Sequence, residues 1–133
     1  MHLSMPRSMH DELIQHALDD NPNEACGLIA GRGNEAVRSY RAINREASPV
    51  RYDIEPADLL RLFRQMDQDG LEHIGIYHSH THTQAYPSAT DIRLAFYPEA
   101  FYVLVSLMDN NPHVRAFRII DGKVSEATLT LTD

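Results

Sequence analysis

The spacing of apolar residues predicts an amphipathic helix near the start of the chain. Between residues 8 and 20, apolar side chains recur three or four positions apart, which is the period of one helix face. Ser8 is a candidate N-cap, because Asp11 follows it three residues later in the manner of a capping box. Asn21-Pro22 then forms a stop signal. We therefore expect the first helix to cover residues 8–20.

A second long helix and a shorter one follow from the same periodicity. Pro56 suits the first turn of a helix that continues over residues 57–67, where apolar positions again mark one face. Residues 90–96 predict a short helix that ends before Pro98.

Apolar and β-branched runs between turn signals predict strands. The run over residues 101–107 is continuously apolar, which is typical of a buried central strand. Asp121-Gly122 favours a tight hairpin turn between the last two strands. The predicted strands are residues 25–30, 35–43, 73–77, 101–107, 115–120 and 124–131, and residues 44–56 form an irregular connection.

Helices and strands mix along the chain without a regular strand–helix–strand repeat. This order predicts an α/β (α+β) fold, in which a mixed β-sheet is flanked by the two longer helices and the short one. At 133 residues the chain has room for a single domain, residues 1–133.

The composition narrows the classes of function. Hydrophobic residues make up 43% and charged residues 23%, as in globular proteins, and no apolar run approaches the ~20 residues of a membrane span. The first residues lack the apolar segment of a secretory signal, so we expect a cytoplasmic protein without membrane partners. The formal net charge of -7 and the dispersed basic residues argue against nucleic-acid binding. Cys26 is the only cysteine, which excludes an internal disulfide and a multi-cysteine metal site.

The segment His78-Ser79-His80 carries the clearest candidate chemistry. On an extended backbone, residues i and i+2 point to the same face, so both imidazoles can converge on one metal ion. Asp91 can supply a carboxylate as the third ligand. Three protein ligands and a water in the fourth position are typical of catalytic zinc. We therefore predict one Zn²⁺ per chain, held by His78, His80 and Asp91.

The residues Ser88-Ala89-Thr90-Asp91 also match a helix N-terminal capping pattern. Taken alone, this pattern favours a purely structural explanation. The two interpretations are compatible, because a capped helix start would fix the direction of Asp91.

Three further residues near the predicted site need an interpretation. Glu24 is a candidate general base, but a lone glutamate is ordinarily a solvated surface charge, and sequence distance does not place it beside the metal. His82 continues the alternation, yet a fourth protein ligand would close the water position, so a place at the rim is favoured. Cys26 lies in an apolar run and is expected to be a buried, inert thiol.

The pattern His78-Ser79-His80, seven residues, Ser88, two residues and Asp91, with Glu24 upstream, closely resembles the JAMM motif of MPN-domain metallopeptidases. The resemblance implies an MPN fold with a curved sheet of cytidine-deaminase-like architecture. It also implies a zinc-dependent peptidase or isopeptidase in which Glu24 is the general acid/base and Ser88 donates to the oxyanion.

The compact chain is most similar to stand-alone bacterial members of the family, of the CysO-cysteine peptidase type. Their likeness implies a ubiquitin-like sulfur-carrier protein with a C-terminal Gly-Gly tail as substrate, with cysteine as a leaving group. Two alternatives stay open, a non-catalytic zinc-containing MPN binding module and a RadC-like DNA-associated protein. The sequence leaves the oligomeric state open, a homodimer included.

Overall fold

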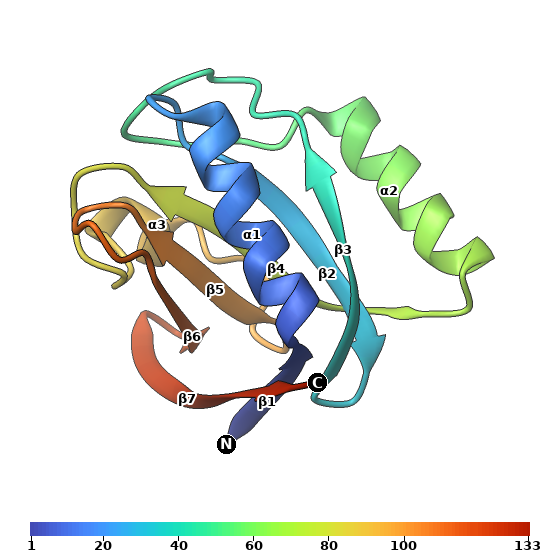
Figure 1. Cartoon of the computed structure of the whole chain (residues 1–133). Helices are drawn as coiled ribbons and strands as arrows, with labels where there is room; N and C mark the ends of the chain where they lie inside the picture. The colour runs from blue at the N-terminus through green and yellow to red at the C-terminus, as the bar shows by residue number, and fades with distance from the viewer.

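The computed structural model describes residues 1–133 and contains one curled β-sheet with three helices packed on it (Figure 1). Seven strands follow in the order β1-β3-β2-β4-β5-β6-β7 and close into a barrel. The pairs β1–β3, β1–β7 and β4–β5 are parallel and the others antiparallel, so the sheet is mixed, as predicted. The strands are β1 (His2–Pro6), β2 (Cys26–Arg32), β3 (Glu35–Ala42), β4 (Glu72–His80), β5 (Phe101–Ser106), β6 (His113–Ile120) and β7 (Lys123–Thr132).

The strand that closes the barrel, β1, is missing from the sequence prediction. It runs parallel to β7 along its whole length and meets β3 only at Ser4 and Glu35. Leu3 and Met5 are buried on one side of it. An alternation over five residues that ends in a proline is too short a signal to separate a strand from an irregular terminus.

Helix α1 (Arg7–Asp20) covers the inner face of the curled sheet (Figure 1). Its buried residues Met9, Leu13 and Ala17 pack in one core cluster with side chains from all seven strands. The helix begins at Arg7, and the prediction that Ser8 caps it is wrong, because Pro6 occupies the N-cap position without a side-chain hydrogen bond. The chain enters α1 directly from β1, which moves the helix start ahead of Ser8.

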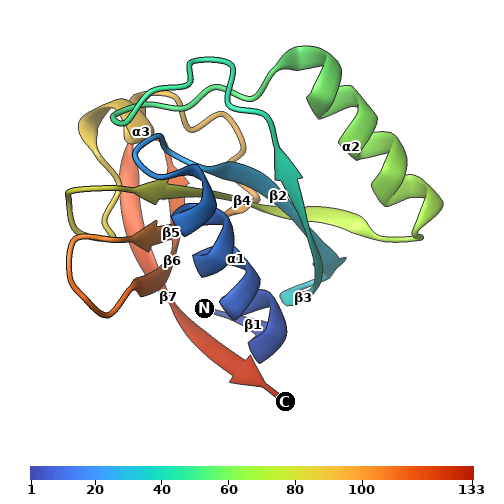
Figure 2. The same cartoon turned by 45° about the horizontal axis from the view of Figure 1, so that its top comes forward.

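Helices α2 (Pro56–Gln68) and α3 (Ala89–Arg93) lie on the outer side of the sheet (Figure 2). Leu62 and Met66 of α2 belong to a second core cluster, with side chains from β2, β3, β4, β5 and β6. Helix α2 starts at Pro56, as predicted. Helix α3 ends at Arg93, earlier than predicted, and the amide of Tyr97 then donates to the Tyr102 hydroxyl at 3.0 Å, which ties the following segment to β5.

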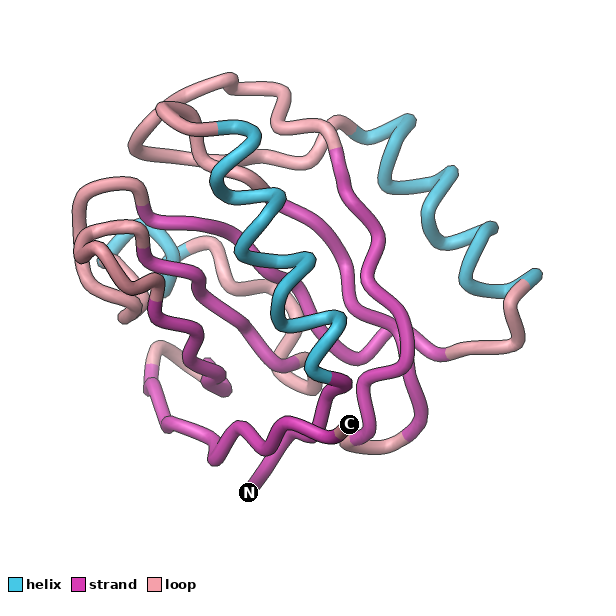
Figure 3. Tube along the Cα trace, viewed as in Figure 1, coloured by secondary structure: helices cyan, strands magenta, loops and turns pink.

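The loops after α1, β3 and β4 gather at one end of the sheet (Figure 3). They comprise residues 21–25, residues 43–55, hereafter the connecting loop, and residues 81–88. No helix has the length and apolarity needed to cross a membrane. The α/β fold predicted from the sequence is confirmed, and the candidate functional residues lie in these loops or in the adjoining ends of β4 and α3.

Candidate active site

Two histidines reach the outer face of the sheet at the end of β4. The strand continues through His80, beyond its predicted end at Tyr77, so the side chains of His78 and His80 share a face. Both are buried. Ser79 points away from them, and its hydroxyl accepts the amide of Ala25 at 2.8 Å. Ser79 therefore fixes the start of β2 to the strand that carries the histidines.

A capping box at the start of α3 directs Asp91 toward the same point. The Ser88 hydroxyl oxygen accepts the Asp91 amide at 3.0 Å, and Oδ2 of Asp91 accepts the Ser88 amide at 2.9 Å. The same Oδ2 lies 3.1 Å from Nε2 of His78 and 3.0 Å from Nε2 of His80. The segment Ser88–Asp91 therefore both caps helix α3 and directs the candidate metal ligand Asp91.

The three side chains fit a metal ion. The two Nε2 atoms are 3.2 Å apart, and ligand atoms around tetrahedral zinc lie roughly 3.3 Å apart when the bonds are ~2.0 Å. His80 Nδ1 lies 2.9 Å from the Gln84 carbonyl, an acceptor that places the proton on Nδ1 and leaves Nε2 free to coordinate. His78, His80 and Asp91 are thus a group that could hold a metal.

Burial and hydrogen bonds hold His78 and Asp91 in the protonation states that metal coordination requires. Burial lowers the pKa of His78, which favours the neutral, coordinating imidazole. Burial acts to raise the pKa of Asp91, but hydrogen bonds with His78, His80 and the Ser88 amide outweigh it, and the pKa lies well below its usual range. Asp91 is therefore held as a carboxylate.

Glu24 lies beside this group and is buried, with 5% of its surface exposed. Burial raises the pKa of its carboxyl to about 8, while the positive charge of His80 opposes the shift and the negative charge of Asp91 adds to it. Oε1 of Glu24 has no hydrogen-bond partner. The structure therefore places an unpaired, proton-accepting carboxyl near the candidate ligands, which sequence distance could not do.

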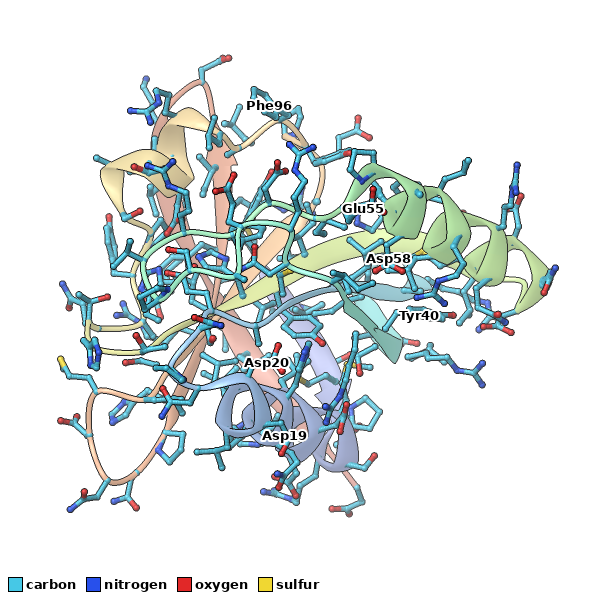
Figure 4. All side chains as sticks on the ribbon, turned by 90° about the horizontal axis from the view of Figure 1, so that it is seen from above. Asp19, Asp20, Tyr40, Glu55, Asp58 and Phe96 are labelled. Carbon is cyan, nitrogen blue, oxygen red and sulfur yellow. The ribbon has the colours of Figure 1, made fainter.

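A cavity of about 490 Å³ opens next to Asp91. Its floor is the row Leu28, Ile76 and Tyr102, which are paired across β2, β4 and β5. This row is two residues from His78 along β4, or about 7 Å. Phe96 of the segment after α3 also lines the cavity, and Figure 4 labels it together with Glu55, the N-cap of α2, and Asp58 in the first turn of that helix. The remaining lining residues are Glu46, Arg51, Tyr52, Asp53, Ile54, Leu59, Thr90, Arg93, Leu94 and Tyr97.

Sequence reasoning missed two aromatic members of this site. The Tyr52 ring stacks on His78, with 4.3 Å between centroids and 23° between planes, yet its sequence context shows only an irregular connection. Tyr102 falls in the run that predicts a buried central strand, but it also lines the cavity. A tyrosine within a core strand needs a partner for its hydroxyl, and this was the one available signal.

The remaining residues near the site take no part in the metal group. His82 is exposed and lies outside it. Cys26 is buried, and burial raises the pKa of its thiol to about 12, which keeps it protonated and unreactive.

Fold and site together define a JAB-type domain. Residues 6–120 match the family of prokaryotic homologues of the JAB domain. The chain is 40% identical to the CysO-cysteine peptidase of Mycobacterium tuberculosis, over 91% of this chain and 85% of that protein. It therefore belongs to the prokaryotic JAB family, and it is a hydrolase of the JAMM class.

Other relatives agree with this assignment. The desampylase of Haloferax volcanii is 30% identical over 78% of this chain and 80% of that protein. A solution structure from Desulfitobacterium hafniense has a TM-score of 0.91 and 34% identity, covering 98% of this chain and 93% of that one. A JAB1/MPN domain protein from Archaeoglobus fulgidus, at 17% identity and a TM-score of 0.65 over 98% and 97% of the two chains, shares the fold.

Proposed function

We propose that this chain, as one domain over residues 1–133, is a zinc-dependent peptidase that cleaves the bond after the C-terminal glycine of a ubiquitin-like carrier protein. The observation that carries the proposal is the buried, unpaired carboxyl of Glu24 beside the ligand group His78, His80 and Asp91. A hydrolase needs an unpaired base next to its electrophilic centre, whereas a structural metal site does not.

His78, His80 and Asp91 would hold one zinc ion, with their coordinating atoms already 3.0–3.2 Å apart. Zinc in such a site supplies a water activated for attack near neutral pH and polarises the scissile carbonyl. Glu24 takes a proton from the attacking water and delivers it to the leaving nitrogen as the C–N bond breaks. The products are a carboxylate on the carrier tail and a free amine.

Ser88 is the candidate donor to the oxyanion. Its oxygen already accepts the Asp91 amide, which leaves its own proton free to donate. The residue is exposed at the start of α3 and is hydrogen-bonded to the candidate ligand Asp91, so its hydroxyl would be open to a substrate carbonyl.

The names of three relatives support a carrier conjugate as the substrate: CysO-cysteine peptidase, desampylase and TtuB-protein conjugate cleaving protease. An extended tail with its scissile carbonyl at the metal and its two glycines beside Asp91 would place the preceding residues over the apolar floor of the cavity, about 7 Å away. Glycines need no pocket of their own, so the cavity suits the residues upstream of them. The leaving amine would be cysteine or a lysine side chain.

Mass spectrometry of the CysO–cysteine adduct before and after incubation tests this function. We expect release of cysteine, its loss after treatment with a chelator, and its recovery when Zn²⁺ is added back. A lysine-linked carrier conjugate is the second substrate of the assay. If the zinc-loaded protein cleaves neither, the proposed function is wrong and a binding role is favoured.

A further inference from the structure

The connecting loop contacts three separate parts of the active site. The Ser48 carbonyl accepts the amide of Glu24 at 2.8 Å. The Pro49 carbonyl accepts the hydroxyl of Thr81, just after the second histidine, at 3.2 Å. The Tyr52 ring covers one face of His78. The loop therefore joins the segment that carries the base to the strand that carries the candidate metal ligands.

Asn44 organises this loop with all the hydrogen bonds that a side-chain amide can make. Its Nδ2 donates to the carbonyls of Glu24 at 3.0 Å and Arg51 at 3.1 Å. Its Oδ1 accepts the amides of Glu46 and Asp53, each at 3.1 Å. Two donors and two acceptors are the full capacity of an asparagine side chain. An amide used so completely has a fixed position, and it transmits that position to Glu24.

The carboxyl of Glu24 depends on its backbone for its position. Oε1 has no partner, so no hydrogen bond there directs the side chain. Both backbone groups are held by the connecting loop, the amide by Ser48 and the carbonyl by Asn44. A base that must remain unpaired to accept a proton can only be aimed through its backbone and its packing.

The two histidines are oriented in different ways. His80 is fixed by the Gln84 carbonyl at Nδ1. Nδ1 of His78 has no hydrogen-bond partner, although the side chain is 1% exposed. The stacked ring of Tyr52 thus supplies the orientation that a hydrogen bond supplies for His80. Tyr52 contacts His78 through its ring, so the ring is the part of Tyr52 that acts on the imidazole.

We propose that Asn44 and Tyr52 are positioning residues of the active site, Asn44 for the carboxyl of Glu24 and Tyr52 for the imidazole of His78. The kinetic part of this inference rests on the proposed function. The inference makes the connecting loop a single element that sets the base against the metal ligands. It predicts that substitution of Asn44 lowers turnover, whereas substitution of Tyr52 weakens metal binding.

Asn44→Asp is the sharpest variant for the first residue, because it keeps the acceptor for Glu46 and Asp53 but removes Nδ2, the donor to the carbonyls of Glu24 and Arg51. We expect kcat to fall on the order of 10²-fold, with KM and zinc affinity unchanged. Amide hydrogen exchange at Glu24 should accelerate in the metal-free protein, a result independent of any substrate. Arg45→Ala is the matched control, since it removes only the exposed ion pair with Asp53 from the same loop.

Two results would overturn the proposed role of Asn44. An unchanged kcat in Asn44→Asp, with unchanged exchange at Glu24, would overturn its role. A fall in kcat that Arg45→Ala reproduces would also overturn it, because the effect would then come from general loosening of the loop. Asn44→Ala gives a second test if the aspartate perturbs the fold.

Tyr52→Leu and Tyr52→Phe test the second residue without substrate. Loss of the ring in Tyr52→Leu should weaken zinc binding about 10–100-fold and shift the visible absorption bands of the Co²⁺-substituted protein. Tyr52→Phe keeps the ring and should match the wild type in both measurements. Wild-type affinity and spectrum in Tyr52→Leu would overturn the assignment. If the wild type cleaved no carrier conjugate, these metal measurements and the exchange data would still decide the inference.

Discussion

The two halves of the active site are built in different ways. The metal half, His78, His80 and Asp91, comes from one strand end and the helix cap that follows it, and its orienting contacts are mostly local. The proposed acid/base half is the single carboxyl of Glu24, which lies two residues before β2. Its backbone is held by residues of the connecting loop, far along the chain. The metal half can therefore form while the base is displaced, so metal binding and turnover should be separable.

Among the tests of this separation, Glu24→Gln should have the largest effect on activity. Loss of a general acid/base typically lowers the rate by about 10²–10⁴-fold, and we expect a fall in kcat of that size with the zinc content unchanged. His80→Ala is the counterpart from the metal half and should lose metal and activity together. Glu99→Gln, at an exposed position, controls for the charge change. Metal analysis and steady-state kinetics on the three variants decide the point; wild-type turnover in Glu24→Gln would remove Glu24 from the mechanism.

Ser88 gives a finer test, because its amide holds the metal half while its hydroxyl is the proposed donor to the oxyanion. Ser88→Ala removes the proposed oxyanion donor, and the loss of such a donor costs about 10²–10³-fold in kcat. Zinc should stay bound, because the backbone amide of Ser88, rather than its hydroxyl, donates to the Asp91 carboxylate. Ser88→Thr keeps a hydroxyl and should recover most of the rate. If Ser88→Ala lost its zinc, the Ser88 hydroxyl would act by holding Asp91 in the capping box, and the oxyanion role would lose its support.

The same contrast explains which parts of the molecule could be predicted from sequence. The alternation of His78 and His80 and the capping pattern at Ser88 are local signals, so the metal group could be proposed from residue spacing. Glu24 has no local signal, and its proposed role rests on resemblance to a family. The contacts of Asn44 and Tyr52 exist only after the connecting loop folds over the sheet. Nothing in their immediate sequence marks them.

The fold likewise divides into features that local sequence predicts and features that depend on distant parts of the chain. The helices and the last hairpin follow from periodicity and turn residues, and Asp121 and Gly122 have the positive φ values, 51° and 76°, that such a turn requires. Closure of the barrel by β1 depends on pairing with β7, at the opposite end of the chain. The misplaced cap at Ser8 has the same origin, because an unforeseen strand runs straight into the helix.

The pH dependence of the free energy of unfolding should show the smallest effect, and it also distinguishes Glu24 from the metal half. In the metal-free protein, burial raises the pKa of Glu24 from 4.5 to about 8. Below pH 4.5 the carboxyl is protonated in both the folded and the unfolded chain, and its contribution is fully present. As the pH rises toward about 8, the unfolded chain ionises first and stability is lost, by up to about 1.4 kcal/mol per pH unit. Above that range the loss is complete and the dependence becomes flat.

Denaturant unfolding of chelated wild type and chelated Glu24→Gln across this range measures the effect. The difference in the free energy of unfolding should grow in favour of the variant as the pH rises, then level off. The carboxylate of the metal half has the opposite sign, because the lowered pKa of Asp91 contributes stability that is lost only as the pH falls. Parallel curves for the two proteins would mean that the Glu24 carboxyl is solvated when folded. The base would then lack the raised pKa that sets it apart from the metal half.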